Sequence, residues 1–300
     1  MSETAGAADA CVIHAPAKLN LGLRVIGRRA DGFHELETTF VAVDLYDELH
    51  VRRTSRRGLG LTCDCDDSAS SLDLGESNLI IRAFRLVERA SGVTLGLDCR
   101  LVKRIPIAAG LGGGSADAAA ALVAADRLCG LATPPERMAD RAAQLGSDVP
   151  FFLGPPVARG TGRGEVLTAA TVFSDWWAVL ISPCITLSTA EVYAALDLTS
   201  LAPTAHVLPC ADGDSFWAAV GRIQNDLESV VVRRVPEISY WREQLIGVGA
   251  RGVSVSGSGP TVFGVFAAPP DPAAMARWRT QGARVFVVRP VQTPRALVIT

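Results

Sequence analysis

The sequence predicts an α+β fold of two domains, and two observations lead to this fold class. The chain has 300 residues, which is enough for two domains of ordinary size. Each half begins with segments that alternate like strands and continues with segments that have helical spacing. We therefore expect an N-terminal domain over residues 1–165 and a C-terminal domain over residues 166–300.

The first half is expected to contain three strands and three helices. Apolar and polar side chains alternate along residues 12–26, which predicts a half-buried strand whose polar face carries Lys18 and Asn20. Residues 53–77 are polar and rich in glycine and serine, so we expect a loop or an irregular hairpin there. The other expected elements are strands at 38–51 and 95–105 and helices at 78–91, 115–128 and 135–145.

The second half is expected to mix short strands with helices. Pro236 interrupts a long segment of helical spacing, so we expect that segment to form separate helices. The expected strands are at 176–183, in two runs within 250–267 and at 282–291, the expected helices are at 187–196 and within 216–249, and 201–214 is an expected loop.

Composition excludes several classes of protein. Apolar residues make up 49% and charged residues 20% of the chain, which indicates a globular protein. The formal net charge of −2 provides no broad basic surface, so we expect neither nucleic acid nor a membrane as a partner. Residues 1–10 lack the pattern of a secretory signal, and no apolar run approaches the roughly 20 residues of a membrane helix. We expect a cytoplasmic protein, as a monomer or a weak homodimer.

Cysteine and histidine do not suggest a metal site. The seven cysteines are scattered and form no C-x-x-C pair, and the four histidines do not cluster. A structural metal site usually needs four such ligands at short spacings. We therefore expect no metal held by the protein alone.

The basic residues are unevenly divided between arginine and lysine. Of 29 basic residues, only Lys18 and Lys103 are lysine. Genome base composition explains such a skew in general, but it makes the two exceptions informative. A compact ammonium fits where a broad, planar guanidinium does not. The two lysines are thus candidates for sites that require an ammonium.

Three consecutive glycines stand directly before an alanine-rich run in "PIAAGLGGGSADAAAAL", residues 106–122. Glycine interrupts a helix and alanine propagates one, so this junction predicts a turn that opens into a helix. Converging backbone N–H groups and the positive end of the helix dipole attract a phosphate. Ser115, at or near the N-cap, could donate its hydroxyl to phosphate or a bound cation. The alternative is a tight turn without a ligand, although capping does not require three glycines.

Two better-known nucleotide motifs are excluded. A Walker A loop would need Gly-Lys-Ser or Gly-Lys-Thr, and no such triplet occurs. The string "GVGARG", residues 247–252, has the glycine spacing of a dinucleotide-binding turn. It follows a helical segment and precedes a strand, which is the reverse of the order that such a turn requires.

Two further segments have weaker signals. Asp148 in "LGSDVPFFLG" stands in a short turn beside aromatic residues, where a carboxylate could serve as a base for a hydroxyl or help to position a metal. The alternative is an ordinary N-cap aspartate. Residues 257–259 form a Gly-Ser-Gly turn that allows close approach of backbone to a ligand or to the first domain, although alone it indicates only a hairpin.

Together these segments resemble the GHMP-type small-molecule kinases from about residue 13 to residue 266. The segments "PAKLNLGL", "RADGFHEL", "PIAAGLGGGSADAAAAL", "LGSDVPFF" and "VSGSGPTVF" occur in the order typical of that family. The resemblance implies a ribosomal-protein-S5-like N-terminal domain and a ferredoxin-like C-terminal domain, with ATP, as its Mg²⁺ complex, and substrate between them. The first, second and fourth segments narrow the implied reaction to ATP-dependent phosphorylation of a cytidine diphosphate-linked methylerythritol at its C2 hydroxyl, a step of non-mevalonate isoprenoid biosynthesis.

The resemblance also assigns roles to individual residues. Lys18 matches the catalytic lysine of the family and Asp148 matches its catalytic base. Phe33 and His34 match the positions that hold the cytosine ring, with Tyr193 stacking opposite. The other substrate-side positions are Asn20 and Thr189, and the nucleotide-side positions are Asn78, Lys103, Pro106, Ile107, Ala108, Ala109, Gly110, Leu111, Gly112, Gly113, Gly114, Ser115 and Ala116.

The sequence departs from the family pattern at four of these positions. Phe33 stands where tyrosine is frequent, which keeps the stacking surface but removes a phenol hydrogen bond. Ala116 stands where a second serine is common, and Ala108 and Ala109 stand where glycines are often found. These departures concern details of ligand contact rather than the reaction.

The implied mechanism is phosphoryl transfer by positioning and charge stabilisation. Asp148 would accept the proton of the acceptor hydroxyl, while Lys18 would keep Asp148 ionised and support the developing negative charge. Two alternatives remain: a kinase of the same family that acts on homoserine, mevalonate or a sugar, and a nucleotide-binding regulator or scaffold without the chemistry. An RNA-binding role lacks a basic and aromatic patch.

Overall fold

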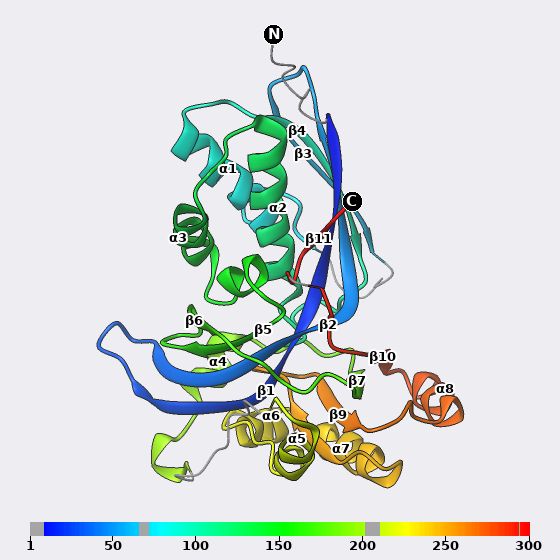
Figure 1. Ribbon diagram of the computed structural model, residues 1–300. Coiled ribbons are helices and arrows are strands. Elements are labelled where there is room, and N and C mark those ends of the chain that lie inside the picture. The colour runs from blue at the N-terminus through cyan, green and yellow to red at the C-terminus, as the bar shows by residue number, and fades with distance from the viewer. Residues whose placement is uncertain (1–8, 66–71, 202–210, 294) are drawn as a thin grey trace.

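The structure is a computed structural model that describes residues 9–65, 72–201, 211–293 and 295–300. Residues 66–71 and 202–210, which belong to the two predicted loops, lie outside the described residues. The described chain forms two sheets, and helices pack against each of them (Figure 1). This arrangement confirms the predicted α+β class.

The N-terminal half is built on a seven-stranded sheet. Five strands follow the order β11-β1-β2-β4-β3, and in addition β5 pairs with β2 and β6 pairs with β5. Helices α1 (Leu79–Ser91), α2 (Gly113–Cys129) and α3 (Pro135–Leu145) lie on one face of this sheet (Figure 1). The strands are β1 (Ala10–Arg28), β2 (His34–Arg53), β3 (Gly58–Cys65), β4 (Gly96–Lys103), β5 (Val157–Thr161), β6 (Val166–Ala169) and β11 (Val298–Ile299).

The C-terminal half is built on a four-stranded antiparallel sheet of order β10-β7-β9-β8. Its strands are β7 (Trp177–Ser182), β8 (Gly252–Val255), β9 (Val262–Phe266) and β10 (Arg284–Val288). The helices are α4 (Thr189–Ala194), α5 (Gly213–Val220), α6 (Glu228–Arg234), α7 (Glu237–Gly247) and α8 (Pro272–Thr280), and two short 3-10 helices are η1 (Val149–Leu153) and η2 (Leu198–Ser200).

The two halves share a hydrophobic core because β7 is buried on both faces. Val179 and Ile181 pack in the cluster formed with α6, α7 and α8. The alternate residues, Ala178 and Leu180, pack instead in the cluster formed with β1 and β2. Strands β1 and β2 are long enough to run from the N-terminal half into the C-terminal half (Figure 1). These two strands thereby bring residues of the N-terminal and C-terminal halves close together.

Helix α2 packs through small side chains. Alanines of α2 such as Ala118 and Ala121 are fully buried, since helix and sheet approach closely there. The helix begins at Gly113 and its N-cap is Gly112, with a φ of +71°, and no side chain caps it. Ser115 therefore lies within the first turn, near the N-cap as expected, and Gly112 rather than Ser115 is the N-cap residue.

Two expectations about strands need correction. The middle of β1 is buried on both faces, not on one, because Lys18 and Asn20 are only 3% and 2% exposed. The predicted loop at 53–77 contains a strand, β3, which pairs in parallel with β4. Its alternation is weak, and the pairing with β4 decides its conformation.

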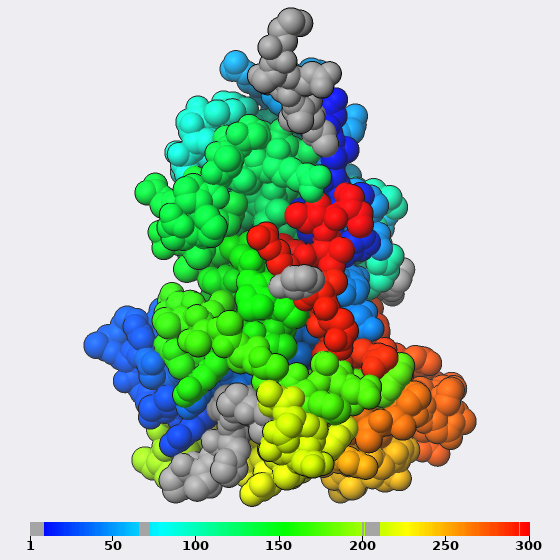
Figure 2. Space-filling model, in the orientation of Figure 1, coloured from blue at the N-terminus to red at the C-terminus, as the bar shows by residue number. Residues whose placement is uncertain are grey.

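Sheet membership does not follow the predicted division at residue 165. Strand β6 pairs with β5, and β11 pairs with β1 at the other end of the chain, so both belong to the N-terminal sheet. The backbone N–H of Ala296 also donates to the carbonyl of Gly154. Figure 2 shows the C-terminal segment, in red, lying on the N-terminal half.

Candidate active site

A cavity of about 1070 Å³ is lined by residues of both halves, including nearly all the residues singled out from the sequence. The glycine loop and β1 line one part of it, the β1–β2 hairpin a second, and the segments 187–198 and 257–258 of the C-terminal half a third. Leu111 and Ala116 are the exceptions. Both are buried in hydrophobic clusters, so their side chains point away from the cavity.

Lys18 and Asp148 meet in this cavity although they are far apart in the sequence. Their Nζ and Oδ2 atoms are 3.4 Å apart. Lys18 also donates to Asn20 Oδ1 at 2.6 Å, and Asn20 donates to the Thr38 hydroxyl at 2.9 Å. The backbone N–H of Lys18 donates to the carbonyl of Leu111 at 2.9 Å, which joins β1 directly to the glycine loop.

Asp148 does not act as a helix cap. It stands at the N-cap position of η1, but its side chain makes no capping hydrogen bond. The side chain is 32% exposed and directed toward Lys18, whose own side chain is only 4% exposed. A partly exposed carboxylate next to a buried ammonium remains accessible to a ligand. This geometry excludes the capping alternative.

The glycine loop requires glycine for two reasons. Gly110 and Gly112 have φ values of +76° and +71°, a region that side chains disfavour. A Cβ atom on Gly110 would lie 2.1 Å from the carbonyl oxygen of Ser256, and one on Gly112 would lie 2.9 Å from Cγ of Lys18. Ala108 has a φ of +52°, which explains physically why glycine is often found at that position.

The turn at 257–259 packs against the glycine loop. The Ser256 hydroxyl donates to the carbonyl of Gly110 at 3.0 Å, and the Thr261 N–H donates to the carbonyl of Ala109 at 3.3 Å. A Cβ on Gly257 would lie 3.1 Å from Nζ of Lys18. The close approach expected of this turn is therefore directed at the first domain and at Lys18.

Lys103 forms a buried triad with two aspartates. Its Nζ lies 2.5 Å from Asp47 Oδ2 and 2.6 Å from Asp117 Oδ2, and all three side chains are at most 5% exposed. Asp47 Oδ1 also accepts the N–H groups of Arg104 and Ile105, at 2.6 and 2.9 Å. The triad thus connects β2, the end of β4 and helix α2 on both sides of the glycine loop.

Burial and charge act in opposite directions on this triad. Burial raises the pKa of Asp117 to about 7, and attraction to Lys103 only partly opposes the shift. Burial alone would lower the pKa of Lys103, but the two carboxylates outweigh it and hold that pKa above its ordinary value. Asp117 Oδ1 is buried without a hydrogen-bond partner among the described residues.

The hairpin end of the cavity is aromatic. The rings of His34 and Tyr193 stack with their centroids 5.2 Å apart. Phe33 is 51% exposed, and the guanidinium carbon of Arg163 lies 4.7 Å from the centroid of its ring. Burial lowers the pKa of His34, and Arg28 lowers it further, so its imidazole is neutral at pH 7. The Thr189 hydroxyl lies 2.8 Å from that of Ser258.

Asn78 lines the cavity but its side chain serves the helix. Its Oδ1 accepts the N–H of Ile80 at 2.9 Å as the N-cap of α1, and its Nδ2 donates to the carbonyl of Asp73 at 2.6 Å. Asn78 is therefore predicted to lie beside the nucleotide, but its Oδ1 and one N–H of its Nδ2 already have partners within the protein.

Sequence reasoning missed three charged residues of the cavity region. Asp117 is the one charged residue in the first three turns of α2, among alanines, and this contrast with its neighbours is the signal that could have identified it. Asp47 occupies a position of the buried face of β2 between Leu45 and Leu49, and this polar residue in an apolar alternation is the signal that could have identified it. Arg163 stands in "RGTGRGE", where the glycines indicated only a turn.

The described parts of the chain contain neither a cluster of metal-binding side chains nor a membrane-spanning helix. No group of three or more His, Cys, Asp or Glu side chains there is placed to hold a metal ion. Nor is any helix there both long enough and apolar enough to span a membrane.

Comparisons with known proteins identify the family of the chain and agree with the fold described above. The chain matches the family model of the GHMP kinases N terminal domain over residues 78–154 and that of the GHMP kinases C terminal over residues 212–283. The homoserine kinase of Cytophaga hutchinsonii superposes with a TM-score of 0.74 over all of both chains. At 18% identity this likeness shows a shared fold alone.

More similar relatives share one name. A 4-diphosphocytidyl-2-C-methyl-D-erythritol kinase of Syntrophotalea carbinolica is 39% identical over 92% of this chain and 98% of its own length. The enzyme of that name from Pelotomaculum thermopropionicum is 40% identical over 92% and 96%. A crystal structure of 4-(cytidine 5'-diphospho)-2C-methyl-D-erythritol kinase is 34% identical, with a TM-score of 0.74 over 93% of this chain and all of that one. Identity at this level over nearly the whole length shows that the chain belongs to the 4-diphosphocytidyl-2-C-methyl-D-erythritol kinase family within the GHMP kinases.

Proposed function

We propose that this kinase transfers the γ-phosphoryl group of ATP to the C2 hydroxyl of 4-diphosphocytidyl-2-C-methyl-D-erythritol, giving the 2-phosphate and ADP. The observation that carries the proposal is the Lys18–Asp148 pair, 3.4 Å apart in the cavity that also contains the glycine loop. The relatives that share this chain's length are named for that substrate. The formal net charge of −2 supports a small-molecule acceptor rather than a nucleic acid.

Asp148 is the proposed general base. Its carboxylate makes no capping bond and is partly exposed, so it can accept a hydrogen bond from a hydroxyl group in the cavity. As the hydroxyl oxygen attacks phosphorus, Asp148 takes its proton and prevents a charged oxonium from forming. Asp148 thereby sets where the acceptor hydroxyl must lie.

Lys18 is the proposed electrostatic partner. Before the reaction, the ammonium of Lys18 forms an ion pair with the carboxylate of Asp148. Once Asp148 is protonated, the positive charge of Lys18 is available to the transferring phosphoryl group. Asn20 fixes the direction of the ammonium through its 2.6 Å hydrogen bond. Buried on β1, Lys18 needs no rearrangement to act.

The glycine loop is the proposed site of the ATP phosphates. Its left-handed glycines bring backbone close to the cavity, and α2 directs its N-terminal end there. Magnesium, when bound with ATP, would neutralise phosphate charge. The donor set fits a metal that arrives with ATP, because Ser115 places a hydroxyl in the cavity wall, whereas no described cluster of ligands holds a metal alone.

The aromatic end is the proposed site of the cytosine ring. Phe33, His34 and Tyr193 line the same cavity as Lys18 and Asp148. Aromatic faces stack on a nucleobase, and a neutral imidazole can both donate and accept a hydrogen bond. Because His34 and Tyr193 stack on each other, a base that enters between them must separate the two rings. This end argues against homoserine, mevalonate or a sugar as the acceptor.

The test is the variant Asp148→Asn, compared with wild type in an assay of ADP release with and without the cytidine substrate. We expect turnover to fall by about 10²- to 10⁴-fold while the thermal unfolding temperature stays close to that of wild type. Asp140→Asn on the exposed face of α3 is the matched control and should keep full activity. Wild-type turnover in purified Asp148→Asn would remove the proposed base. A cytoplasmic location and a monomer or weak homodimer remain predictions.

A further inference from the structure

We infer that Arg163 binds the diphosphate group of the cytidine diphosphate-linked substrate, and that Phe33 holds the Arg163 guanidinium in position for this contact. The inference rests on the proposed function, because it names the residue that would recognise one chemical group of that substrate. Arg163 belongs to the turn between β5 and β6, which the sequence did not associate with the site.

The first argument is the charge balance of the cavity. Its wall includes four lysine and arginine side chains: Lys18, Arg28, Lys103 and Arg163. Lys18 is paired with Asp148, and Lys103 is paired with two buried aspartates. A diphosphate that leaves water needs cationic donors in its place. Arg163 has an ion pair with Glu165 through Nε alone, so its terminal nitrogens and the more exposed Arg28 are left for this role.

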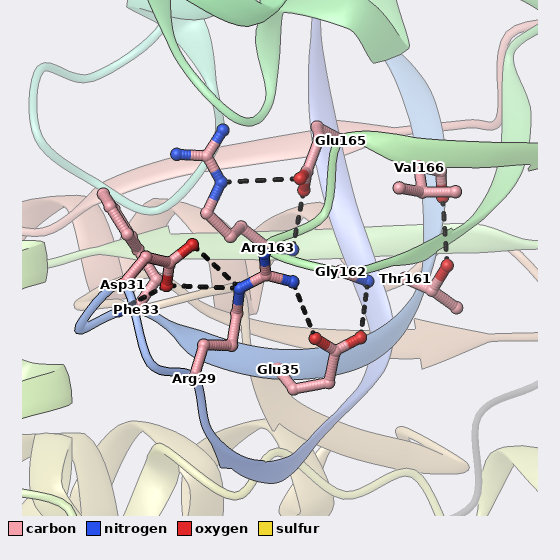
Figure 3. A network of polar contacts seen from close by, with 9 residues as sticks. All are labelled: Arg29, Asp31, Phe33, Glu35, Thr161, Gly162, Arg163, Glu165 and Val166. Atoms are coloured by element: carbon pink, nitrogen blue, oxygen red, sulfur yellow. Dashed lines mark hydrogen bonds and ion pairs between the residues drawn. The ribbon is translucent and has the colours of Figure 1, made fainter.

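The second argument is the state of the Arg163 side chain. Its Nε lies 3.4 Å from Glu165 Oε1, and its backbone N–H donates to Glu165 Oε2 at 2.6 Å. Within the described residues, no acceptor lies within hydrogen-bond distance of its two terminal nitrogens. Figure 3 shows these nitrogens pointing away from Glu165. A guanidinium with both terminal N–H₂ groups open can bind phosphate oxygens in a bidentate manner.

The third argument is position. In the substrate, the diphosphate connects the cytidine to the methylerythritol, so it must lie between the stacked base and the reacting hydroxyl. Arg163 contacts Phe33 at the aromatic end of the cavity. The next residue, Gly164, faces the reacting end, because a Cβ atom there would lie 3.9 Å from Asp148 Oδ1. Arg163 therefore stands between the two groups that the diphosphate joins.

The fourth argument is that the turn is held in place before any ligand arrives (Figure 3). The N–H of Gly162 donates to Glu35 Oε1 at 3.2 Å, and its carbonyl accepts the N–H of Leu36 at 2.8 Å. Glu35 in turn accepts a 2.9 Å hydrogen bond from Arg29 on the β1–β2 hairpin. The ring of Phe33 supports one face of the guanidinium. A donor fixed in this way loses little conformational freedom when it binds.

The test compares the binding of CDP and of cytidine to wild type and to Arg163→Leu by calorimetry. We expect Arg163→Leu to bind CDP about 10- to 100-fold more weakly, because a charged hydrogen bond to phosphate is lost. Cytidine has no phosphate, so its affinity should change by less than about twofold. In turnover assays the KM for the cytidine substrate should rise by the same factor as the CDP dissociation constant, with the KM for ATP unchanged.

Arg159→Leu is the matched control. Arg159 lies on β5 four residues earlier, pairs with Glu37 and is not part of the cavity wall. Removing it should leave both affinities unchanged. Arg163→Lys keeps the charge but loses the planar, bidentate fork, so its CDP affinity should fall between those of wild type and Arg163→Leu. Unfolding temperatures of all the variants check that each one folds.

Two results would overturn the inference. Equal weakening of CDP and cytidine would show that Arg163 only supports the Phe33 ring. Unchanged CDP affinity in folded Arg163→Leu would show that Arg163 does not contact the diphosphate. Failure of the proposed function is a separate outcome, because wild type itself would then bind neither ligand and would not phosphorylate the substrate.

Discussion

The two lysines of this chain occupy the same cavity wall but different electrostatic environments. Lys18 has one carboxylate partner, 3.4 Å away, which is one-third exposed. Lys103 lies between Asp47 and Asp117, both of which are fully or almost fully buried. Lys18 is joined to its partner only loosely, whereas the contacts of Lys103 are short and closed to solvent.

This difference separates a lysine suited to chemistry from a lysine suited to architecture. Asp148 can exchange the ammonium of Lys18 for water or a ligand, because part of its side chain is exposed in the cavity. Asp47 and Asp117 have no such alternative, so Lys103 cannot leave without two buried charges losing their partner. The excess of arginine marked both lysines as unusual without distinguishing them, and only the resemblance to the GHMP kinases assigned the catalytic role to Lys18 and a nucleotide-side position to Lys103. Three predictions test whether the distinction holds.

The largest effect on stability is expected for Lys103→Met. This change leaves two buried carboxylates without their cation, and the free energy of unfolding should fall by about 3–5 kcal/mol. Urea denaturation at pH 7 measures it. The double variant with Asp117→Asn should recover part of the loss, because one of the two unpaired charges is then absent. A loss below about 1 kcal/mol in Lys103→Met would show that the triad is not an architectural element.

For Lys18→Met we expect the opposite result, a large loss of turnover with little change in stability. Turnover should fall by about 10²- to 10³-fold, as is typical when one charged donor to a transition state is removed. The free energy of unfolding should change by no more than about 1 kcal/mol, because Asp148 can be hydrated instead. Steady-state kinetics and urea denaturation of the same preparation measure both quantities.

Lys18→Arg sharpens that prediction. It keeps the positive charge, but the positions of Gly112 and Gly257 leave little room, since Cβ atoms there would lie 2.9 and 3.1 Å from Lys18 atoms. We expect turnover to be lost in this variant as well. Activity near the wild-type level would show that charge alone, rather than a compact ammonium, is needed at this position.

The smallest effect concerns the pH dependence of stability. Burial raises the pKa of Asp117 to about 7, whereas an unfolded aspartate titrates near 3.8. Between these values the folded state holds a proton that the unfolded state has lost, so this group contributes stability at low pH that disappears as the pH rises toward 7. We expect its contribution to fall by about 1 kcal/mol between pH 5 and pH 6.

The variant Asp117→Asn identifies the source of this pH dependence. It removes the titrating group, so its free energy of unfolding should depend less steeply on pH over the same range than that of wild type. Denaturation curves at several pH values between 4 and 8 measure the two slopes. Identical slopes in the two proteins would assign the proton to another group.

Much of the fold could be predicted because its signals are local. The alternation along β1, the helical spacing of α1 and α3 and the glycine-to-alanine junction before α2 depend on neighbouring residues only. Strand β3 could not be predicted in this way, because it acquires its conformation from parallel pairing with β4, more than thirty residues later. The return of β11 to β1 from the opposite end of the chain has the same cause.

The residues of the site likewise divide into those that the sequence identified and those that it did not. The glycine loop and Lys18 were identifiable from composition, whereas Asp148 had only a weak signal of its own and was identified through the resemblance to the GHMP kinases. The partners that decide how they behave were not, because Asp47, Asp117 and Arg163 come from other strands, helices and turns.

The sequence by itself determined which backbone conformations are possible and which side chains could take part in a reaction. Glycines allow left-handed turns, alanines propagate a helix, and two lysines provide compact charges wherever they are placed. Only the tertiary structure decided that one lysine faces a partly exposed carboxylate, that the other lies between two buried ones, and that an arginine lies on Phe33. The physical reason is range: conformational preference acts between adjacent residues, whereas burial and electrostatic pairing depend on distances that exist only after the chain has folded.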